Sequence, residues 1–363
     1  MTRAIGRQVR PIRVLSIPGP RHEQNSYFGL LWNALQGAGM EMADVRTTAA
    51  LLLKFDIVHL HFPEHLVTER RLHSALLVAP IFLLYVATAR ALGKKFVWTI
   101  HEVYPKRRYW LAQPYLSCLH ILANAYIFMN RTSEQEFLNR YPHERRKMAW
   151  RIPHSSYPVP KISGRRRDEV RASLSRGTDC LLVGFLGEIR PYKNLAALPI
   201  LPATDPQGRP VRLVVAGALH ESCDVDDIEA KLQAIDPNRL VRIETRLSDE
   251  RLSEVIQSID VVFMPYLQGW NSGFAMFALA CGARLLCSAL PMFREIRERL
   301  GSPWIYLFDP NAADLPQTLS NVVAGISRDR PNEEDRHRLE RFLADTGFEQ
   351  TASRHVELYR SIL

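Results

Sequence analysis

The stretch GFLGEIRPYKN, residues 184–194, joins a strand-like apolar run directly to two cations. Gly187 ends the run and allows the backbone to approach a ligand closely. Arg190 and Lys193 follow within one short turn. A guanidinium binds phosphate through two parallel N–H donors, and an ammonium acts as a compact point charge. The stretch therefore predicts a buried strand followed by a diphosphate-binding turn, although a solvated basic turn would have the same sequence.

The same pattern of an apolar run and a polar end recurs along the chain. Short runs rich in Val, Ile and Leu alternate with helix-length segments, which is typical of parallel sheets covered on both faces. The runs lie at 12–17, 56–62, 96–101 and 125–130 in the first half, and at 180–187, 211–217, 241–246, 261–266 and 284–288 in the second. We therefore expect an α/β protein with two Rossmann-like, doubly wound domains facing across a cleft.

A segment rich in Pro, Ser, Gly and Arg, residues 155–177, separates the two series of runs and is the expected hinge. The predicted domains are 1–160 and 161–345. The chain closes with two helical patterns, and we expect the last helix, about 346–363, to pack back on the N-terminal domain.

Composition narrows the classes of partner. The 363 residues include 47 Lys and Arg against 38 Asp and Glu, and the sequence pI is about 9.4. This excess favours a polyanionic partner: nucleic acid, an acidic membrane surface or a phosphorylated substrate. Scattered arginines, with no basic helix stripe and no RNA-binding motif, argue against nucleic acid. Five cysteines without CxxC or zinc spacing, and no signal-peptide pattern, predict reduced thiols in the cytoplasm.

The segment SALLVAPIFLLYVATA, residues 74–89, carries no charge. Arg71 precedes it, and Arg90, Lys94 and Lys95 follow. It is short of the ~20 residues of a membrane span. One interpretation is a buried helix of an α/β domain, and the other is a helix that dips into the inner leaflet while its basic flanks meet anionic lipid.

A second candidate anion site is PYLQGWNSGFAMFALA, residues 265–280. A strand ends near Tyr266, and Asn271, Ser272 and Gly273 open an apolar helical run. Asn and Ser are good N-caps, and the amides of a helix N-terminus together with its dipole bind anions. A plain capped core helix is the alternative. The coincidence of two anion sites after strands of one domain favours a nucleotide-sugar site. Neither GxxxxGK[ST] nor a GxGxxG after the first strand is present, which argues against an ATP hydrolase and an NAD-binding protein.

The N-terminal domain should then hold the acceptor and a general base. Glu64 follows the run at 56–62 and is the first candidate, and His101, after the run at 96–101, is the second. An ordinary capping or hydrogen-bonding role is the alternative for each. Asn25 lies after the first run, on the expected acceptor side. His59 and His61 share a strand face, but without a third ligand we predict no metal site.

These motifs together resemble GT-B glycosyltransferases, and among them the xanthan-type β-mannosyltransferases of bacterial exopolysaccharide synthesis. The resemblance lies in FDIVHLHFPEHL, TIHEVYP, EIRPYKN and PYLQGWNSG, residues 55–66, 99–105, 188–194 and 265–273. It implies transfer of a sugar from a nucleotide diphosphate, GDP-mannose, to an oligosaccharide on a polyprenyl diphosphate. It also implies that no metal or other cofactor is needed.

The resemblance assigns roles to the candidates. Arg190 and Lys193 fall where the family holds the donor diphosphate, and residues 271–273 fall where its helix amides receive phosphate. Glu64 matches the Pro-Glu after the HxH strand. Many retaining members carry two glutamates eight positions apart, but this sequence has Gly269 and Phe277 there. The departure favours inversion with Glu64 as base and leaves the donor's ribose without its usual carboxylate.

A lipid-linked acceptor would give residues 74–89 and the basic cluster Lys106, Arg107 and Arg108 a purpose. We expect peripheral, monotopic attachment of the N-terminal domain to the inner face of the cytoplasmic membrane. Two alternatives stay open: a UDP-sugar-dependent glucuronosyl, glucosyl or galactosyl transferase, and a catalytically inactive GT-B partner subunit.

Overall fold

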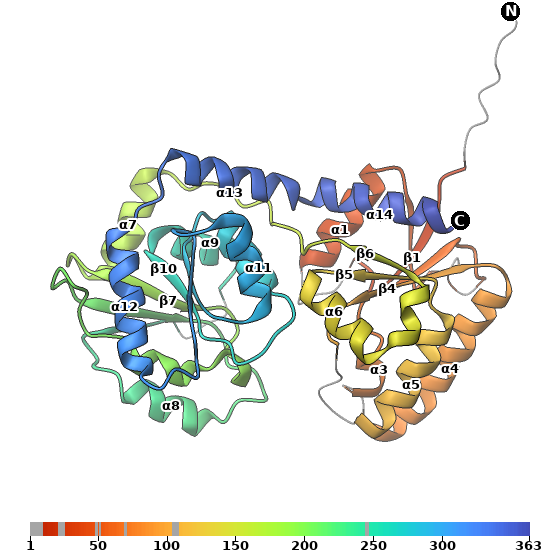
Figure 1. Cartoon of the computed structure of the whole chain (residues 1–363), viewed down its shortest axis with the longest axis horizontal. Helices are drawn as coiled ribbons and strands as arrows, with labels where there is room; N and C mark the ends of the chain where they lie inside the picture. The colour runs from red at the N-terminus through yellow and green to blue at the C-terminus, as the bar shows by residue number, and fades with distance from the viewer. Residues whose placement is uncertain are drawn as a thin grey trace, which may run out of the picture. The chain divides into compact units, whose positions relative to one another are not determined.

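The computed structural model describes residues 10–20, 26–47, 50, 52–68, 71–103, 109–243 and 247–363 (Figure 1). The chain forms two compact units, and the second is inserted into the first in sequence. Unit 1 comprises Met1–Ser155 and Phe348–Leu363, and unit 2 comprises Ser156–Gly347.

The chain passes from unit 1 to unit 2 between Ser155 and Ser156, five residues before the predicted boundary. The boundary lies there because these neighbouring serines form hydrogen bonds with different units. The Ser155 hydroxyl donates to Thr351 Oγ1 at 2.8 Å, within unit 1. The Ser156 amide donates to Thr346 O at 2.9 Å, and its hydroxyl donates to Leu343 O at 2.8 Å, within unit 2.

The sheet of unit 1 is parallel throughout, in the order β2-β1-β3-β4-β5-β6. Its strands are β1 Arg13–Ile17, β2 Glu41–Asp44, β3 Ile57–Leu60, β4 Lys95–Ile100, β5 Ala125–Phe128 and β6 Met148–Arg151. The inner strands β3 and β5 are fully buried, whereas β2 and β6 at the edges are largely accessible.

Helices cover this sheet. They are α1 Ser26–Gly37, α3 His65–Thr68, α4 Leu72–Ala91, α5 Tyr109–Leu122, α6 Arg131–Arg140 and α14 Phe348–Ile362, with the 3₁₀ turn η1 Pro142–Arg146. The last helix, α14, packs against α1, and α4 packs against α3 and α5. The predicted last helix therefore forms and belongs to unit 1.

Helix α4 contradicts the interpretation of residues 74–89 as a buried helix. Its packed face consists of small side chains, Ala75, Ala79, Val86 and Ala89. Several of its larger side chains point outward, with Leu77 65% exposed and Leu84 69% exposed, whereas Phe82, Leu83 and Tyr85 are half-buried. Within the described residues it is the one helix long and apolar enough to cross a membrane, with mean hydropathy 1.9, and 22% of that window is buried.

The sheet of unit 2 is also parallel, in the order β12-β11-β10-β7-β8-β9. Its strands are β7 Leu181–Leu186, β8 Val211–Ala216, β9 Leu240–Ile243, β10 Val261–Met264, β11 Leu285–Ser288 and β12 Ile305–Phe308. The chain reverses its strand order between β7 and β10, and open α/β sheets bind ligands at the carboxyl ends of the strands beside such a reversal.

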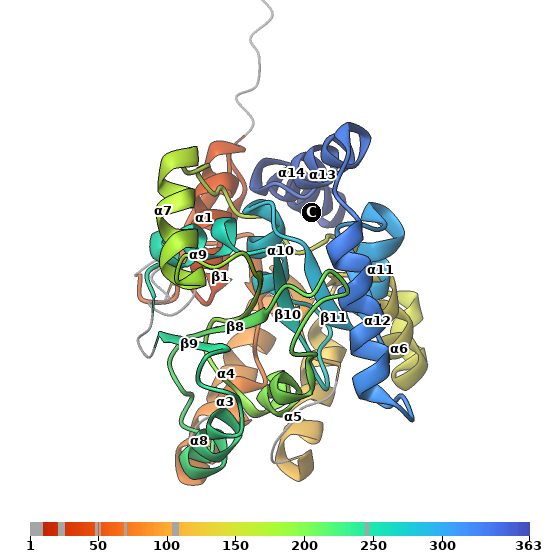
Figure 2. The ribbon, with the colours of Figure 1, turned by 90° about the vertical axis from the view of Figure 1, so that its left-hand side faces the viewer.

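Two hydrophobic clusters lie on the two faces of this sheet. One face is covered by α7 Gly164–Ser175, α9 Asp249–Ser258, α10 Gly273–Ala280, α11 Pro291–Leu300 and α13 Glu333–Asp345, and the other by η3 Leu195–Ile200, α8 Val225–Gln233 and α12 Leu315–Arg328. Figure 2 shows α8 and α12 beside the strands. The α/β class and the two doubly wound sheets are as predicted.

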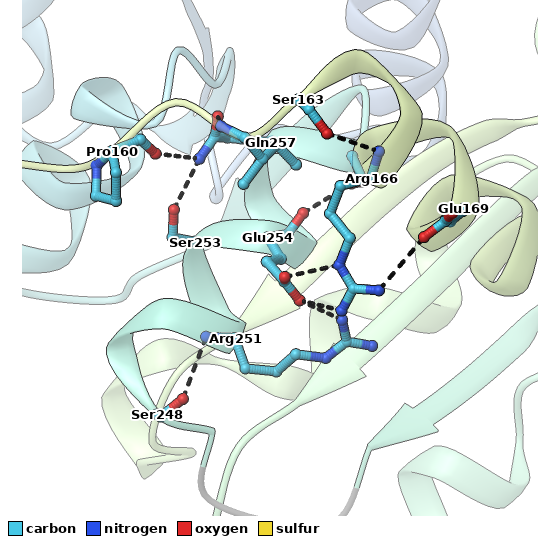
Figure 3. Close-up of polar contacts among 11 residues, drawn as sticks. Pro160, Ser163, Arg166, Glu169, Ser248, Arg251, Ser253, Glu254 and Gln257 are labelled. Carbon is cyan, nitrogen blue, oxygen red and sulfur yellow. Dashed lines mark hydrogen bonds and ion pairs between the residues drawn. The ribbon is translucent and has the colours of Figure 1, made fainter.

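The expected hinge contains helix α7, which is held to α9 by a polar network (Figure 3). Ser163 caps α7, and Arg166 donates to both carboxylate oxygens of Glu254 on α9, at 2.7 and 2.8 Å. Hydrogen bonds from Arg166 and then Arg251 lower the pKa of Glu254 to about 2. Apolar periodicity did not show this helix, because few of its side chains are apolar and charged contacts help to dock it.

Candidate functional site

The turn after β7 is shaped by glycines and backbone bonds. Gly187 has φ +79°, and a Cβ there would lie 3.4 Å from Lys193 Nζ. Gly217, after β8, approaches so closely that a Cβ would lie 2.2 Å from Gly187 O. The Ile189 amide donates to Ala218 O and its carbonyl accepts from the His220 amide, both at 2.9 Å. These hydrogen bonds fix the backbone at Ile189 and therefore the directions in which the side chains of Glu188 and Arg190 leave it.

Lys193 ends the short 3₁₀ turn η2, Pro191–Lys193, and its side chain is buried, with 6% exposed. Its ammonium lies 5.3 Å from the centre of the Phe274 ring and 5.9 Å from that of Tyr266. Among the described residues it makes no hydrogen bond or ion pair. Burial lowers the pKa of Lys193 to about 8, with Glu188 opposing this shift. A buried cation without a counter-ion is a strong anion-binding group.

The N-terminus of α10 lies beside this ammonium, since Phe274 belongs to its first turn. Ser272 Oγ accepts from the Ala275 amide at 3.1 Å and caps the helix as predicted. The first amides of a helix have no acceptor within the helix, so those of Gly273 and Phe274 are available to an anion. The structure therefore brings Gly187, Lys193 and the α10 N-terminus together at the reversal point of the sheet.

Tyr266 and Asn271 complete the surroundings. Tyr266 is 4% exposed, and its ring packs edge-on against Tyr192 at 5.5 Å. Burial raises the pKa of Tyr266 well above its usual value, while a hydrogen bond with Ser272 opposes this. Tyr266 is thus a neutral wall of the site. Asn271 directly precedes the cap and is partly buried.

Arg190 has a partner that sequence reasoning missed. Its Nε donates to Glu188 Oε2 at 2.6 Å, and the two side chains are 40% and 45% exposed. The spacing i, i+2 was the available signal, because alternate residues of an extended segment share a face.

The two positions that lack the retaining-family glutamates serve packing. Phe277 lies in α10 and meets Tyr157 edge-on, with ring centres 5.6 Å apart. Gly269 has φ +156°, and a Cβ there would lie 3.0 Å from Met292 Cε. An acidic side chain at either position would disturb this packing, so the backbone around α10 agrees with the departure seen in the sequence.

In unit 1, Glu64 and Glu102 line one small pocket, with the aromatic side chains of Trp98, His120 and Tyr141. Glu64 precedes α3 and is 6% exposed. Tyr115 lies near enough for the Glu64 charge to raise its pKa, after burial as the larger cause.

His101 belongs instead to a buried histidine cluster. Its Nε2 lies 3.1 Å from His61 Nδ1, and its ring stacks on Phe62 at 4.0 Å. The His61 ring lies 4.3 Å from that of His59, whose Nδ1 is 2.7 Å from the Tyr359 hydroxyl. Burial lowers the pKa of His101 well below its ordinary value and that of His61 to about 3. The cluster is therefore neutral at physiological pH.

Asn25, Arg107 and Arg108 lie outside the described residues. Within the described part of the chain, no group of three or more His, Cys, Asp or Glu side chains could hold a metal ion.

Comparisons with known proteins agree with this architecture. No protein-family model matches the sequence. Two proteins of Xanthomonas campestris pv. campestris, both named GDP-mannose:glycolipid 4-beta-D-mannosyltransferase, are 25% and 24% identical over 324 residues, which are 86% of this chain and 84% of each relative.

Solved structures show the same fold along nearly the whole chain. Sucrose-phosphate synthase from Thermosynechococcus elongatus has a TM-score of 0.66 at 15% identity, over 97% of this chain and 99% of that chain. HepE from Anabaena, in complex with UDP and glucose, has a TM-score of 0.66 at 14% identity, over 97% of this chain and 100% of that chain. The chain thus has the GT-B fold of these proteins, with two Rossmann-like units.

Proposed function

We propose that this chain, a glycosyltransferase with the GT-B fold, transfers mannose from GDP-mannose to a glycolipid with inversion at C1. The observation that carries the donor assignment is Lys193, a buried ammonium without an ion pair among the described residues, beside the N-terminus of α10. The choice of mannose is supported by the similarity to two GDP-mannose:glycolipid mannosyltransferases over 86% of the chain.

The chemistry follows from these groups. The sugar of GDP-mannose is α-linked, and the relatives are named as forming a β-linkage, so one displacement with inversion gives that product. As the acceptor oxygen attacks C1, the bond to the diphosphate breaks and negative charge grows on the departing oxygen. Lys193, Arg190 and the amides of Gly273 and Phe274 stabilise this charge. Because these cations neutralise the diphosphate, we expect transfer to continue in EDTA.

Glu64 is the group that we assign as general base. A carboxylate in a pocket that excludes water can accept the proton of the acceptor hydroxyl. His101 is less suited, because Nε2 faces His61 and burial holds its pKa well below the ordinary value. Glu64→Gln should lower kcat by about 10²–10⁴-fold while GDP binding is unchanged. If kcat were unchanged in Glu64→Gln, another residue would have to be the general base.

The donor assignment is tested by calorimetry with GDP, UDP and ADP, each with and without EDTA. We expect binding of GDP, no effect of EDTA, and loss of binding in Lys193→Met. Lys231→Met, on α8, removes an equal charge from unit 2 and should bind normally. Binding of UDP alone would change the sugar donor, and binding of no nucleotide would overturn the donor site. Transfer of radiolabelled mannose to a glycolipid extract then tests the reaction.

We also propose that the acceptor is a polyprenyl-diphosphate-linked oligosaccharide of exopolysaccharide assembly and that unit 1 rests on the inner face of the cytoplasmic membrane. The outward face of α4, defined as Leu72, Leu76, Leu77, Ile81 and Leu84, supports this, each side chain being at least 43% exposed. Arg71 at its start and Lys94 and Lys95 just after its end would meet anionic headgroups, whereas the Arg90 guanidinium donates to Leu122 O and Lys94 O within unit 1.

Flotation with vesicles of phosphatidylethanolamine and phosphatidylglycerol tests this attachment. The wild-type protein should float with the vesicles, and the double variant Leu77→Glu/Leu84→Glu should stay in solution. Val225→Glu/Leu267→Glu provides a matched control, because both side chains are exposed, at 55% and 57%, and lie in unit 2. Equal flotation of both double variants would remove α4 from the proposal.

A further inference from the structure

The backbone around Ile189 places Glu188 and Arg190 on one face. Ile189 is 4% exposed and forms an isolated bridge with Leu219. In an extended segment successive side chains point to opposite faces. Because Ile189 points into the core of unit 2, Glu188 and Arg190 both point to the opposite side, and their charged groups meet at 2.6 Å.

Glu188 also lies close enough to the second cation of the site for its charge to act on the pKa of Lys193. Its charge is the main influence that raises the pKa of Lys193 against burial, whereas Arg190 lowers it. No other carboxylate among the described residues is paired with Arg190 or Lys193. The two cations proposed to hold the donor diphosphate therefore share one acidic neighbour, which comes from the same turn.

The pairing is weak enough to be exchanged. Both side chains are 40% or more exposed, and exposed ion pairs are worth only ~0–1 kcal/mol. A nucleoside diphosphate carries more charge than one carboxylate and can take Arg190 in a bidentate contact. Binding of the donor would thus replace Glu188 as the partner of Arg190.

We propose that Glu188 is a built-in counter-anion of the donor site: it holds Arg190 in the empty protein and is displaced by the diphosphate of the nucleotide. This inference rests on the proposed donor site. Displacement of Glu188 lowers the affinity for every diphosphate, including the nucleoside diphosphate product, and so assists product release. Glu188 is a positioning residue, since it acts through Arg190 and Lys193.

Glu188→Gln, which keeps the shape and removes the charge, tests the proposal by calorimetry with GDP and with inorganic pyrophosphate. We expect both to bind about two- to five-fold more tightly, because the competing ion pair is gone. The gain should shrink as salt rises. Glu340→Gln, on the exposed face of α13, makes the same change in net charge and should leave both affinities unaltered.

A pH profile separates this role from a merely structural one. Without Glu188 the Lys193 ammonium loses the charge that raises its pKa, so the pH at which GDP affinity falls should move downward in Glu188→Gln. Weaker GDP binding with unchanged pyrophosphate binding would mean that Glu188 holds the ribose, and would overturn the proposal. Unchanged affinity for both would also overturn it. If the wild-type protein binds no nucleotide, the donor site itself is wrong.

Discussion

Lys193 keeps a positive charge in surroundings that oppose it. Desolvation lowers its pKa to about 8, and the rings of Tyr266 and Phe274 supply only a modest attraction. Such an arrangement costs folding free energy unless an anion is bound, and it is therefore expected at a binding site rather than in a core. At the residue scale, the site is an ammonium that forms no ion pair among the described residues and is available to an anionic substrate.

The first prediction concerns the pH dependence of donor binding. A bound diphosphate favours the charged form of Lys193 and raises its pKa above the value of about 8 in the free protein. Binding therefore takes up a proton above pH 8, and the affinity for GDP should fall by up to about tenfold per pH unit between pH 8 and the pKa of the complex. Calorimetry at pH 7, 8 and 9 measures this fall. In Lys193→Arg, which stays charged, a similar fall would show that another group titrates.

The second prediction separates capping from ligand binding at Ser272. Ser272 Oγ accepts from the Ala275 amide, and Ser248 Oγ accepts from the Arg251 amide in the same way at the start of α9. Loss of a serine cap costs about 0.5–2 kcal/mol of stability. Ser272→Ala and Ser248→Ala should lower the free energy of unfolding similarly in urea, but only Ser272→Ala should weaken GDP binding. Equal nucleotide affinity in both variants would remove Ser272 from the site.

At the element scale, α4 reverses the usual arrangement of a surface helix. Small residues form its packed face, and four of its five leucines are exposed. Close packing of alanines against α3 and α5 leaves little room for larger side chains there. The outward leucines contribute little to the stability of unit 1 and are available to contact the hydrocarbon region of a membrane.

The third prediction tests this reversal with a reciprocal pair. Ala79 is 5% exposed, so Ala79→Leu should overpack the helix interface and lower the free energy of unfolding by about 1–3 kcal/mol. Leu77 is 65% exposed, so Leu77→Ala should change it by less than about 0.5 kcal/mol. Urea unfolding followed by circular dichroism compares the two variants. A large loss in Leu77→Ala would show that this face packs against protein.

Strand prediction found the inner strands of both sheets and one edge strand, β9, but missed the other three edge strands. All nine predicted runs contain strands, including the continuous apolar runs of β7 and β8. The missed strands β2, β6 and β12 are edge strands of four residues each. In β2 and β6 the accessible positions break the apolar run. β12 is mostly buried and as short as several strands that were predicted, so neither length nor exposure explains why it was missed.

Part of the candidate site follows the same logic. The cations after β7 and the cap of α10 could be found because each lies at the end of a recognisable strand or the start of an apolar helix. The contact of His101 with His61 could not be found, and the pairing of Glu188 with Arg190 had only the i, i+2 spacing as a signal. They depend on backbone direction and on the register between neighbouring strands, which local sequence does not specify.

At the scale of the whole molecule, unit 1 is completed from both ends of the chain. Helix α14 contributes Tyr359, which is fully buried and bonds to His59. His355, also on α14, donates through Nδ1 to Thr351 O at 2.7 Å and lies 5.5 Å from the His59 ring. The histidine cluster therefore joins residues about three hundred positions apart, and no local pattern could show it.

The fourth prediction is that unit 1 is sensitive to acid. Burial lowers the pKa of His61 to about 3 and those of His154 and His355 to about 4, all below the unfolded value of ~6.5. The unfolded chain thus binds more protons between these values, so stability is full above about pH 6.5 and falls as pH drops towards 4. The expected slope is roughly 1 kcal/mol per pH unit for each histidine that titrates.

Urea unfolding at pH 7.5, 6.5 and 5.5 measures this slope. His355→Asn, whose amide can still donate to Thr351 O, should flatten it, while His337→Asn on the exposed surface of α13 should leave it unchanged. A slope that His355→Asn does not alter would place the acid sensitivity elsewhere.

The return of the chain at Phe348 has a consequence for biosynthesis. Unit 2 is continuous in sequence and has all its residues once Gly347 is made, whereas unit 1 lacks α14 until residues 348–363 leave the ribosome. Residue 155 precedes residue 363 by 208 positions, which at ~5–20 residues per second takes roughly 10–40 s. During that time the surface of α1 that contacts α14 is uncovered on the nascent chain. We therefore expect the usual order of domain folding to be inverted here, with the amino-terminal unit maturing last and most in need of a chaperone.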